Sequence, residues 1–213
     1  MEKKKSNISM AVIKRLPKYH RYLQELLKND VDRISSKELS EKIGFTASQI
    51  RQDLNCFGDF GQQGYGYNVK DLYNEISGIL GLTKDYKTVI IGAGNIGQAI
   101  ANYTRFDRLG FTLDGIFDAN PKLIGLKIRD VEIRDIDFLA EFLVKNKVDI
   151  GIICVPNNSA QKVCDALVRN GVEAIWNFAP TDLIVPQNIV VENVHLSESL
   201  LTLTYLLKDR QEQ

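Results

Sequence analysis

The sequence is poor in the residues that build disulfides and metal sites, with 3 cysteines and 2 histidines among its 213 residues. Cys56, Cys154 and Cys164 form no C-x-x-C pair, and their odd number is typical of a protein in a reducing cytosol. Cys154 and Cys164 stand in apolar or helical segments, where we expect small core residues. His20 and His195 are far apart and have no partners at metal-ligand spacing, so we predict no metal site.

Long apolar runs are also missing. No stretch approaches about 18 uncharged apolar residues, which excludes a membrane-spanning helix. The segment Met1–Lys5 leads into no apolar secretory core, so we expect a protein that is not exported and works in the cytoplasm. A hydrophobic fraction of 44% and a charged fraction of 25% are ordinary for a soluble globular protein.

The net charge is zero, but the charge is unevenly distributed. Residues 1–70 hold 13 Lys/Arg and 8 Asp/Glu, whereas the remainder holds 14 and 19. A basic half is suited to a polyanion, and the acidic half then serves another task.

The first half has the pattern of short helices. Apolar residues recur at helical spacing just after Pro17, and this predicts a first helix. Its apolar face comprises Tyr19, Tyr22, Leu23, Leu26 and Leu27. The S-x-x-E sequence from Ser35 to Glu38 predicts a capping box that opens a second helix, and Gly44 ends it.

A second capping box, Thr46 with Gln49, predicts a third helix with Ile50, Leu54 and Phe57 on its buried face. Helix, glycine turn and helix over about residues 19–58 is a helix-turn-helix pattern. The opposite face suits hydrogen bonding to base edges in DNA. That face carries Ser48, Gln52 and Asn55, with Gln49 and Arg51 on its flanks. The alternative is a solvated polar helix face; the position after a capped helix and a glycine turn favours DNA.

The segment from Gly58 to Tyr67 is dense in glycine and aromatic residues and predicts a hairpin. After a recognition helix, such a hairpin over about 58–68 is a wing that lies along DNA, and we assign Tyr65 to that contact. The alternative is a surface loop with two stacked tyrosines.

From Lys87 onward apolar strands alternate with helices, which predicts a doubly wound parallel sheet of the Rossmann type. The expected strands are Thr88–Ile91, Leu113–Phe117, Val148–Cys154, Ala174–Phe178 and Ile189–Val191. The expected helices are Gln98–Leu109, Ile136–Lys145 and Ala160–Arg169. With Ile79–Tyr86 as linker, we predict an α/β protein with a winged helix at 1–80, a Rossmann domain at 86–192 and a terminal helix in 193–213.

The loop after the first of these strands has the G-x-G-x-x-G pattern of a dinucleotide site. It reads Gly92, Ala93, Gly94, Asn95, Ile96 and Gly97. Gly92 makes the tight turn, Gly94 lets the backbone approach a pyrophosphate, and Gly97 lets the helix pack on the strand. The helix amides face the phosphates.

Asp118 follows at the end of the next strand and can accept hydrogen bonds from both ribose hydroxyls. It would repel a 2′-phosphate, so NAD(H) is favoured over NADP(H), although Lys122 nearby points the other way. FAD, S-adenosylmethionine or purely structural glycines are the alternatives.

After Val191 only about twenty residues remain, too few for a substrate domain. Most form one helix, Leu196–Leu207, which is apolar around most of its circumference. This predicts burial against a partner subunit, with docking on its own domain as the alternative. We therefore predict a non-enzymatic sensor; a small NAD-dependent oxidoreductase and a module whose helix-turn-helix binds protein are the rivals.

The chain resembles the Rex family of bacterial redox-sensing repressors over nearly its whole length. The matching segments are Lys14–Pro17, Ser35–Leu39, Gln49–Leu54, Phe57–Gly58 through Gly64–Val69, Gly92–Gly97 and Trp176–Pro180. The resemblance implies a homodimer with exchanged C-terminal helices that binds inverted-repeat operators when NADH is scarce. It also implies that NADH releases the repressor.

Two departures from the family accompany this resemblance. Family members commonly carry Asp where His195 stands, and that Asp joins an Arg and a Tyr in a switch contact between the domains. Arg15 and Tyr103 match these two partners, so the replacement leaves Arg15 without this charge partner. The wing tip carries Gln62 and Gln63 where a basic residue is common, which weakens its phosphate contact.

The further cofactor contacts we expect are Tyr103, Val155, Pro156 and Phe178. A closed dimer that buries the ring among Pro156, Phe178 and the partner's Leu196 disfavours the positive ring of NAD⁺ through desolvation. Our hypothesis is that NADH stabilises this closed dimer, whose recognition helices no longer match half-sites about 34 Å apart.

Overall fold

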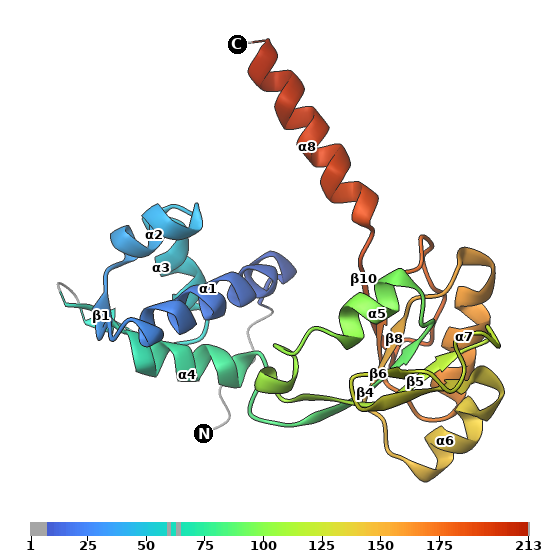
Figure 1. Cartoon of the computed structure of the whole chain (residues 1–213). Helices are drawn as coiled ribbons and strands as arrows, with labels where there is room; N and C mark the ends of the chain where they lie inside the picture. Colours follow the sequence, from blue (N-terminus) through green and yellow to red (C-terminus); the bar gives the residue numbers. More distant parts are fainter. Residues whose placement is uncertain (1–7, 59–60, 63–64, 213) are drawn as a thin grey trace. The chain divides into compact units, whose positions relative to one another are not determined.

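The structure is a computed structural model that describes residues 8–58, 61–62 and 65–212. The chain divides into two compact units, Met1–Lys84 and Asp85–Gln213 (Figure 1). The division falls within the segment Ile79–Tyr86 that the sequence analysis assigned to a linker. Each unit has a hydrophobic core of its own.

The first helix of the N-terminal unit, α1, spans Met10–Lys28 and begins at the N-cap residue Ser9. The prediction that it begins after Pro17 is wrong, because Pro17 lies inside the helix. A proline there removes one backbone hydrogen bond. Leu16 and Tyr19, on either side of it, are fully buried in the domain core, and this packing stabilises a helix that local propensity would end.

Helices α2 (Ser36–Ile43) and α3 (Ala47–Asn55) form the helix-turn-helix. The capping box of Ser35 and Glu38 is present, and Gly44 ends α2 in the left-handed conformation, as predicted. The Thr46 hydroxyl accepts a hydrogen bond from the Gln49 backbone N–H, which is the first half of the second predicted box. The returning bond from the Gln49 side chain is absent among the described contacts, so that capping box is wrong in part.

The buried face of α3 carries Ile50 and Leu54, as predicted, together with an unpredicted Asp53. Phe57 lies beyond the helix end and is half-buried against the same core.

The wing is a small antiparallel sheet. Strand β3 (Gly66–Asn68) pairs with β1 (Arg33–Ile34) on one side and β2 (Gly61–Gln62) on the other. Gly66 has φ of +70°, and a Cβ there would meet the Ile34 carbonyl oxygen at 2.7 Å. Only glycine therefore fits this position. Part of the predicted wing lies outside the described residues, namely Asp59, Phe60, Gln63 and Gly64.

Helix α4 (Val69–Ile79) completes the first unit and was not predicted. The Asn68 side chain caps it, and Leu72 and Ile76 pack into the core shared with α1. Tyr67, just before it, is buried while Tyr65 is exposed, so the alternative of two stacked tyrosines is wrong.

The described part of the second unit holds a seven-stranded sheet in the order β10-β9-β8-β4-β5-β7-β6. Its parallel strands are β4 (Tyr86–Ile91), β5 (Phe111–Asp118), β7 (Val131–Asp135), β8 (Ile150–Ile153), β9 (Ala174–Asn177) and β10 (Val190–Asn193). The short antiparallel edge strand β6 (Lys127–Ile128) and its neighbour β7 were not predicted. Without β6, this is the 3-2-1-4-5-6 order of doubly wound dinucleotide-binding sheets, with the reversal between β4 and β8.

The helix expected over Gln98–Leu109 is in fact two pieces, so that prediction is wrong. Helix α5 spans Asn95–Ala101, and a single 3₁₀ turn, η1, follows at Asp107–Leu109. Between them the Phe106 ring packs edge-on against Trp176, with centroids 5.7 Å apart. Because this ring packs on the sheet, the chain forms a turn here and does not continue as a helix.

Helix α7 (Asn157–Arg169) begins three residues earlier than expected, and the segment Ile136–Lys145 is a 3₁₀ turn, η2 (Ile136–Phe138), followed by α6 (Leu139–Lys145). Alternate residues of the strands serve two cores. Val89 and Ile91 face the core packed by α6 and α7, and Ile90 faces the core packed by α5.

The last helix, α8, spans Leu196–Gln211, and none of its described residues is buried. Leu200 and Leu203 are 61% and 59% exposed. The alternative that this helix docks on its own Rossmann domain is therefore not observed. Across the described ranges, no helix is long and apolar enough to cross a membrane.

Candidate nucleotide site and DNA-binding face

The glycine loop lies between β4 and α5, where the strand order reverses. Gly92 has φ of +100°, and a Cβ there would lie 2.5 Å from the Cys154 carbonyl oxygen. A Cβ on Gly97 would lie 1.9 Å from the Gly92 carbonyl oxygen. A Cβ on Gly94 would meet nothing within 4 Å, so the space in front of this residue is open to a ligand. The geometry matches the separate roles expected of the three glycines.

Asp118 ends β5 beside this loop. Its Oδ2 accepts a hydrogen bond from the Ala93 N–H at 2.6 Å, and its Oδ1 accepts one from the Asn120 N–H at 2.7 Å. Each carboxylate oxygen can accept about two hydrogen bonds, so both keep capacity for ligand hydroxyls. The carboxylate therefore holds the loop in shape and also faces the cleft.

A cleft of about 710 Å³ opens at this edge of the sheet, which is within the usual size range of small-molecule sites. Most of the predicted nucleotide residues line it, namely Gly92, Gly94, Ile96, Asp118, Val155, Pro156 and Phe178. Lys122, the cation that would favour a 2′-phosphate, is not among the described residues that line the cleft.

A second depression of about 440 Å³ shares Ile96 and Phe178 with the cleft. Asn95, Tyr103 and Leu196 also line it. The remaining loop residues, Ala93 and Gly97, are buried, and Ala93 acts through its backbone N–H. The structure thus brings the predicted cofactor residues together along one cleft and its adjoining depression.

Cations of α7 also line the cleft and were not predicted from the sequence. Lys162 and Arg169 share the cleft-facing side of the helix with Ser159 and Ala166. Their spacing of three or four residues along α7 is the signal that could have found them. Two cations favour an anionic ligand in this cleft.

The Cys154 thiol borders the cleft but is chemically quiet. Burial raises its pKa to about 12, so the thiol stays protonated near neutral pH. Burial also raises the pKa of Cys164. Both cysteines are small core residues, as expected.

The polar face of α3 is open. The five side chains of α3 that were predicted to meet DNA are all exposed, namely Ser48, Gln49, Arg51, Gln52 and Asn55. Arg51 donates a hydrogen bond to the Ser36 hydroxyl at 2.8 Å, which links α3 to the start of α2.

Tyr65, beside the wing strands, is 69% exposed. The Arg33 guanidinium lies over its ring, 6.0 Å from the centroid, and donates to the Tyr65 carbonyl oxygen. Arg33 was not predicted as part of this face. It lies on β1, which pairs directly with β3, and this pairing brings it to the wing.

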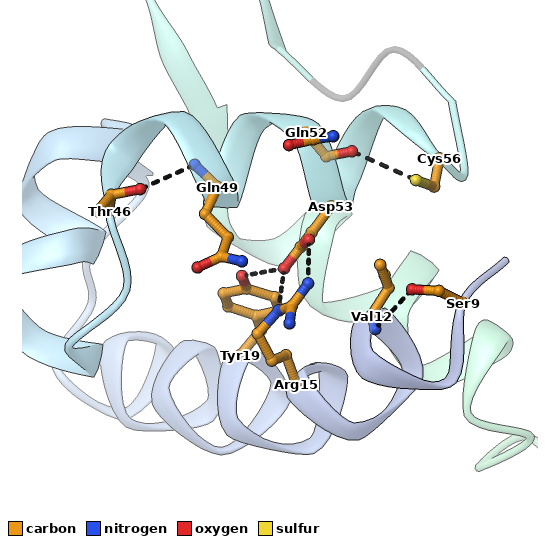
Figure 2. A network of polar contacts seen from close by, with 9 residues as sticks. All are labelled: Ser9, Val12, Arg15, Tyr19, Thr46, Gln49, Gln52, Asp53 and Cys56. Atoms are coloured by element: carbon orange, nitrogen blue, oxygen red, sulfur yellow. Dashed lines mark hydrogen bonds and ion pairs between the residues drawn. The ribbon is translucent and has the colours of Figure 1, made fainter.

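The inner side of α3 is fixed by a buried polar network around Asp53 (Figure 2). Arg15 of α1 donates to the two carboxylate oxygens at 2.6 and 2.7 Å, and the Tyr19 hydroxyl donates at 2.7 Å. Burial opposes ionisation of Asp53, but the hydrogen bonds from Arg15 and Tyr19 outweigh it and lower its pKa. The charged pair fixes α3 against α1.

The residues assigned to a switch each have partners within their own unit. Arg15 of the first unit is held by Asp53. In the second unit, the Tyr103 ring packs 4.8 Å from Phe106, and the His195 Nε2 lies 3.4 Å from Asp182 Oδ1.

A winged helix-turn-helix joined to a dinucleotide-type Rossmann domain defines a nucleotide-responsive DNA-binding regulator. Comparison with known families agrees with both halves. The family described as "Putative DNA-binding protein N-terminus" matches residues 7–55, and the family described as "CoA binding domain" matches residues 83–181.

Among curated relatives, the chain is 76% identical to the redox-sensing transcriptional repressor Rex of Clostridium acetobutylicum, over 97% of this chain and 96% of the relative. It is 73% identical to Rex of Clostridium tetani, over 98% and 99% of the two chains. The chain belongs to the Rex family of redox-sensing transcriptional repressors. Because these relatives are repressors, the oxidoreductase alternative is not favoured.

Solved structures of RSP, a Rex-family repressor, are also similar. RSP in complex with β-NAD⁺ and operator DNA is 64% identical with a TM-score of 0.90, over 97% of this chain and 95% of RSP. RSP in complex with β-NADH is 62% identical with a TM-score of 0.88, over 97% of both chains.

Proposed function

We propose that this protein is a cytoplasmic redox-sensing transcriptional repressor that binds operator DNA and is released when NADH binds. The observation that carries the proposal is a cleft lined by Gly92, Gly94 and Asp118, in one chain with an open helix-turn-helix. Family membership supports it, as do the RSP complexes with NAD⁺, NADH and operator DNA.

The residues of the cleft fit a dinucleotide. The open space at Gly94 admits a pyrophosphate against the backbone, and Lys162 and Arg169 bring positive charge to the cleft. The spare acceptor capacity of Asp118 suits the two hydroxyls of the adenosine ribose and excludes a 2′-phosphate. We assign adenosine to this end of the cleft.

The opposite end is apolar and suits a nicotinamide. Val155, Pro156 and Phe178 line the cleft, and Phe178 continues into the depression lined by Tyr103 and Leu196. The nicotinamide ring is positive in NAD⁺ and neutral in NADH. An apolar enclosure therefore favours the reduced form, because it withholds solvation from the charged ring.

A homodimer with exchanged C-terminal helices supplies that enclosure. The apolar side chains of α8 are exposed within one chain. On the α5 side of the sheet, a pocket of about 310 Å³ remains open, lined by Ile90, Ile152, Phe106 and Trp176 among others. Parallel sheets are normally covered on both faces. The exposed apolar side chains of a second copy's α8 can cover this apolar face. This arrangement brings the partner's Leu196 to the nicotinamide end.

The DNA-binding surface is assigned to the exposed face of α3, with Tyr65 at the wing. Gln side chains can bridge adenine, and Arg51 can bridge guanine or pair with phosphate. A dimer places two such faces on an inverted repeat.

The test is a titration of operator affinity against NADH and, separately, NAD⁺. A near-complete switch requires a differential affinity of about 5.5 kcal/mol across the dimer. We expect saturating NADH to weaken operator binding strongly and NAD⁺ to leave it nearly unchanged. Equal operator affinities with the two nucleotides would refute the proposal.

A further inference from the structure

Asn177, at the end of β9, is a fully buried polar residue whose side chain ties three segments together. Its Nδ2 donates to the Thr181 carbonyl oxygen at 2.7 Å and to Asn193 Oδ1 at 2.8 Å. Its Oδ1 accepts a hydrogen bond from the Ala179 N–H at 3.0 Å. A buried amide satisfied at both ends fixes its surroundings in one arrangement.

One of these segments forms the nicotinamide end of the cleft. Phe178 follows Asn177 directly and lines both the cleft and the adjoining depression. The Phe178 N–H donates to the Ile153 carbonyl oxygen at 2.9 Å, and the bond from Ala179 to Asn177 fixes the turn just after it. The position of the Phe178 ring therefore depends on the Asn177 side chain.

Another of the segments leads into α8. Asn193 lies opposite Asn177 in the parallel pairing of β10 with β9, and the Val194 N–H donates to the Asn177 carbonyl oxygen at 2.8 Å. Helix α8 begins three residues later at Leu196, which lines the same depression as Phe178. The root of α8 is thus joined to the nicotinamide end of the cleft through a pair of asparagines.

We infer that Asn177 and Asn193 are positioning residues that transmit nucleotide binding to α8. A shift of Phe178 on nicotinamide binding moves Asn177, and the 2.8 Å bond to Asn193 carries that movement to the start of the helix. The inference rests on the proposed function and adds to it the route between the nucleotide site and the dimer helix. Coupling of this kind requires an element whose two positions the ligand favours unequally.

The variant Asn193→Ala tests the route. It removes the acceptor that joins Asn177 to β10, while the Thr181 and Ala179 bonds to Asn177 remain. Asn193 is exposed, so the chain should fold. We expect NADH affinity and nucleotide-free operator affinity to stay within about twofold of wild type. The factor by which NADH weakens operator binding should fall about tenfold, within the usual range of coupling between sites.

Asp182→Ala is the matched control. It removes the outer contacts of the same segment, Asn193 Nδ2 to Asp182 at 3.3 Å and His195 Nε2 to Asp182 at 3.4 Å. The Asp182 side chain is 86% exposed, and the Asn177–Asn193 bond is left intact. This variant should keep the NADH response within about twofold of wild type.

The measurement is operator affinity by fluorescence anisotropy with and without NADH, beside direct titration of NADH. If NADH weakens operator binding by the same factor in wild type and in Asn193→Ala, the inference is overturned and the proposed function is not. Loss of NADH affinity in proportion to the lost response also overturns it, because Asn193 would then belong to the binding site. If NADH does not change the operator affinity of the wild-type protein, both the proposed function and this inference are overturned.

Discussion

At the scale of single residues, Asp53 and Gln52 are neighbours on α3 with opposite surroundings. Asp53 is buried and bound by Arg15 and Tyr19, whereas Gln52 is exposed on the face assigned to DNA (Figure 2). Removing one charge of a buried ion pair strongly destabilises the fold, because the other charge is left buried and unpaired. Asp53→Asn should therefore lower the free energy of unfolding by about 3 kcal/mol, measured by chemical denaturation.

Gln52→Ala is the control for this change. It should leave the free energy of unfolding within about 0.5 kcal/mol of wild type, while operator binding weakens by about 1–3 kcal/mol. Tyr19→Phe removes one hydrogen bond to Asp53 and should destabilise the chain by about 1 kcal/mol. Equal stabilities of Asp53→Asn and Gln52→Ala would contradict the network's role.

Asp118 carries a separate prediction in the second unit. Asp118→Ala removes the acceptor of the Ala93 N–H and the proposed ribose acceptor, so NADH affinity should fall by about 2–3 kcal/mol. Nucleotide-free operator binding should stay nearly intact, because the helix-turn-helix belongs to the other unit. Calorimetry with NADH and anisotropy with operator DNA measure the two effects. Loss of DNA binding by the nucleotide-free variant would count against separable domains.

We expect His20 to make the stability of the protein pH-dependent. It is buried, its ring stacks on Tyr73 at 4.6 Å, and its Nε2 has no hydrogen-bond partner in the described structure. Burial lowers its pKa in the folded state. As pH falls through about 6.5, the unfolded chain binds a proton that the buried ring resists, so stability is lost.

Denaturation at pH 7.5 and 5.5 measures this loss. His20→Phe keeps the stacking and removes the titrating group, so it should reduce the loss between the two pH values. His195→Gln replaces the other histidine and should leave most of the loss in place. If His20→Phe and wild type lose equal stability, the acid sensitivity has another origin.

At the scale of secondary structure elements, the sequence predicted those helix ends and turns that are determined by residues close together in the chain. Ser35 with Glu38 and Gly44 marked the ends of α2, and the glycine loop followed by Asp118 marked the strand–helix–strand unit. The failures arose where tertiary packing overrides propensity. Pro17 continues a helix because its neighbours are buried, and the chain leaves the helix after Ala101 so that the Phe106 ring can pack on Trp176.

The candidate site followed the same division. The nucleotide loop could be predicted because part of what requires its glycines is local: Gly92 has a positive φ, and Gly97 lies against the Gly92 carbonyl oxygen five residues earlier. The partners of Asp53 could not, because Arg15 lies 38 residues away in the sequence and only folding brings it near. The same holds for Asn177 and Asn193, which meet only through the pairing of β9 with β10.

Helix α8 gives the prediction that belongs to this scale. Leu203 is 59% exposed in one chain, and we propose that a second copy buries it. Leu203→Lys places a cation in that interface, so the dimer should dissociate at micromolar concentration. Thr202→Lys adds the same charge one residue earlier, four residues after Glu198, and should leave the dimer intact. Sedimentation velocity gives the mass; an unchanged dimer for Leu203→Lys would exclude α8 from the interface.

At the scale of the whole molecule, one chain combines a basic DNA-binding half with an acidic nucleotide-binding half. Each half carries a candidate binding surface of its own, and regulation requires that the second half control the spacing of two copies of the first. A dimer meets this requirement, because a small rotation at the nucleotide domains moves two recognition helices relative to a fixed operator. Because the spacing of the half-sites on DNA is fixed, a change in the shape of the dimer changes its affinity for the operator.

Half-site spacing tests this control directly. In an operator selected from random duplexes by this protein, an insertion of about 5 base pairs between the half-sites turns one of them to the opposite side of the DNA. The nucleotide-free dimer should then bind no better than it binds a single half-site, at least about 100-fold more weakly than the parent operator. Saturating NADH should lower binding to the parent operator to the same level, because the closed dimer also engages one half-site at a time. If the insertion leaves affinity unchanged, the two DNA-binding domains move independently, and NADH cannot act through their spacing.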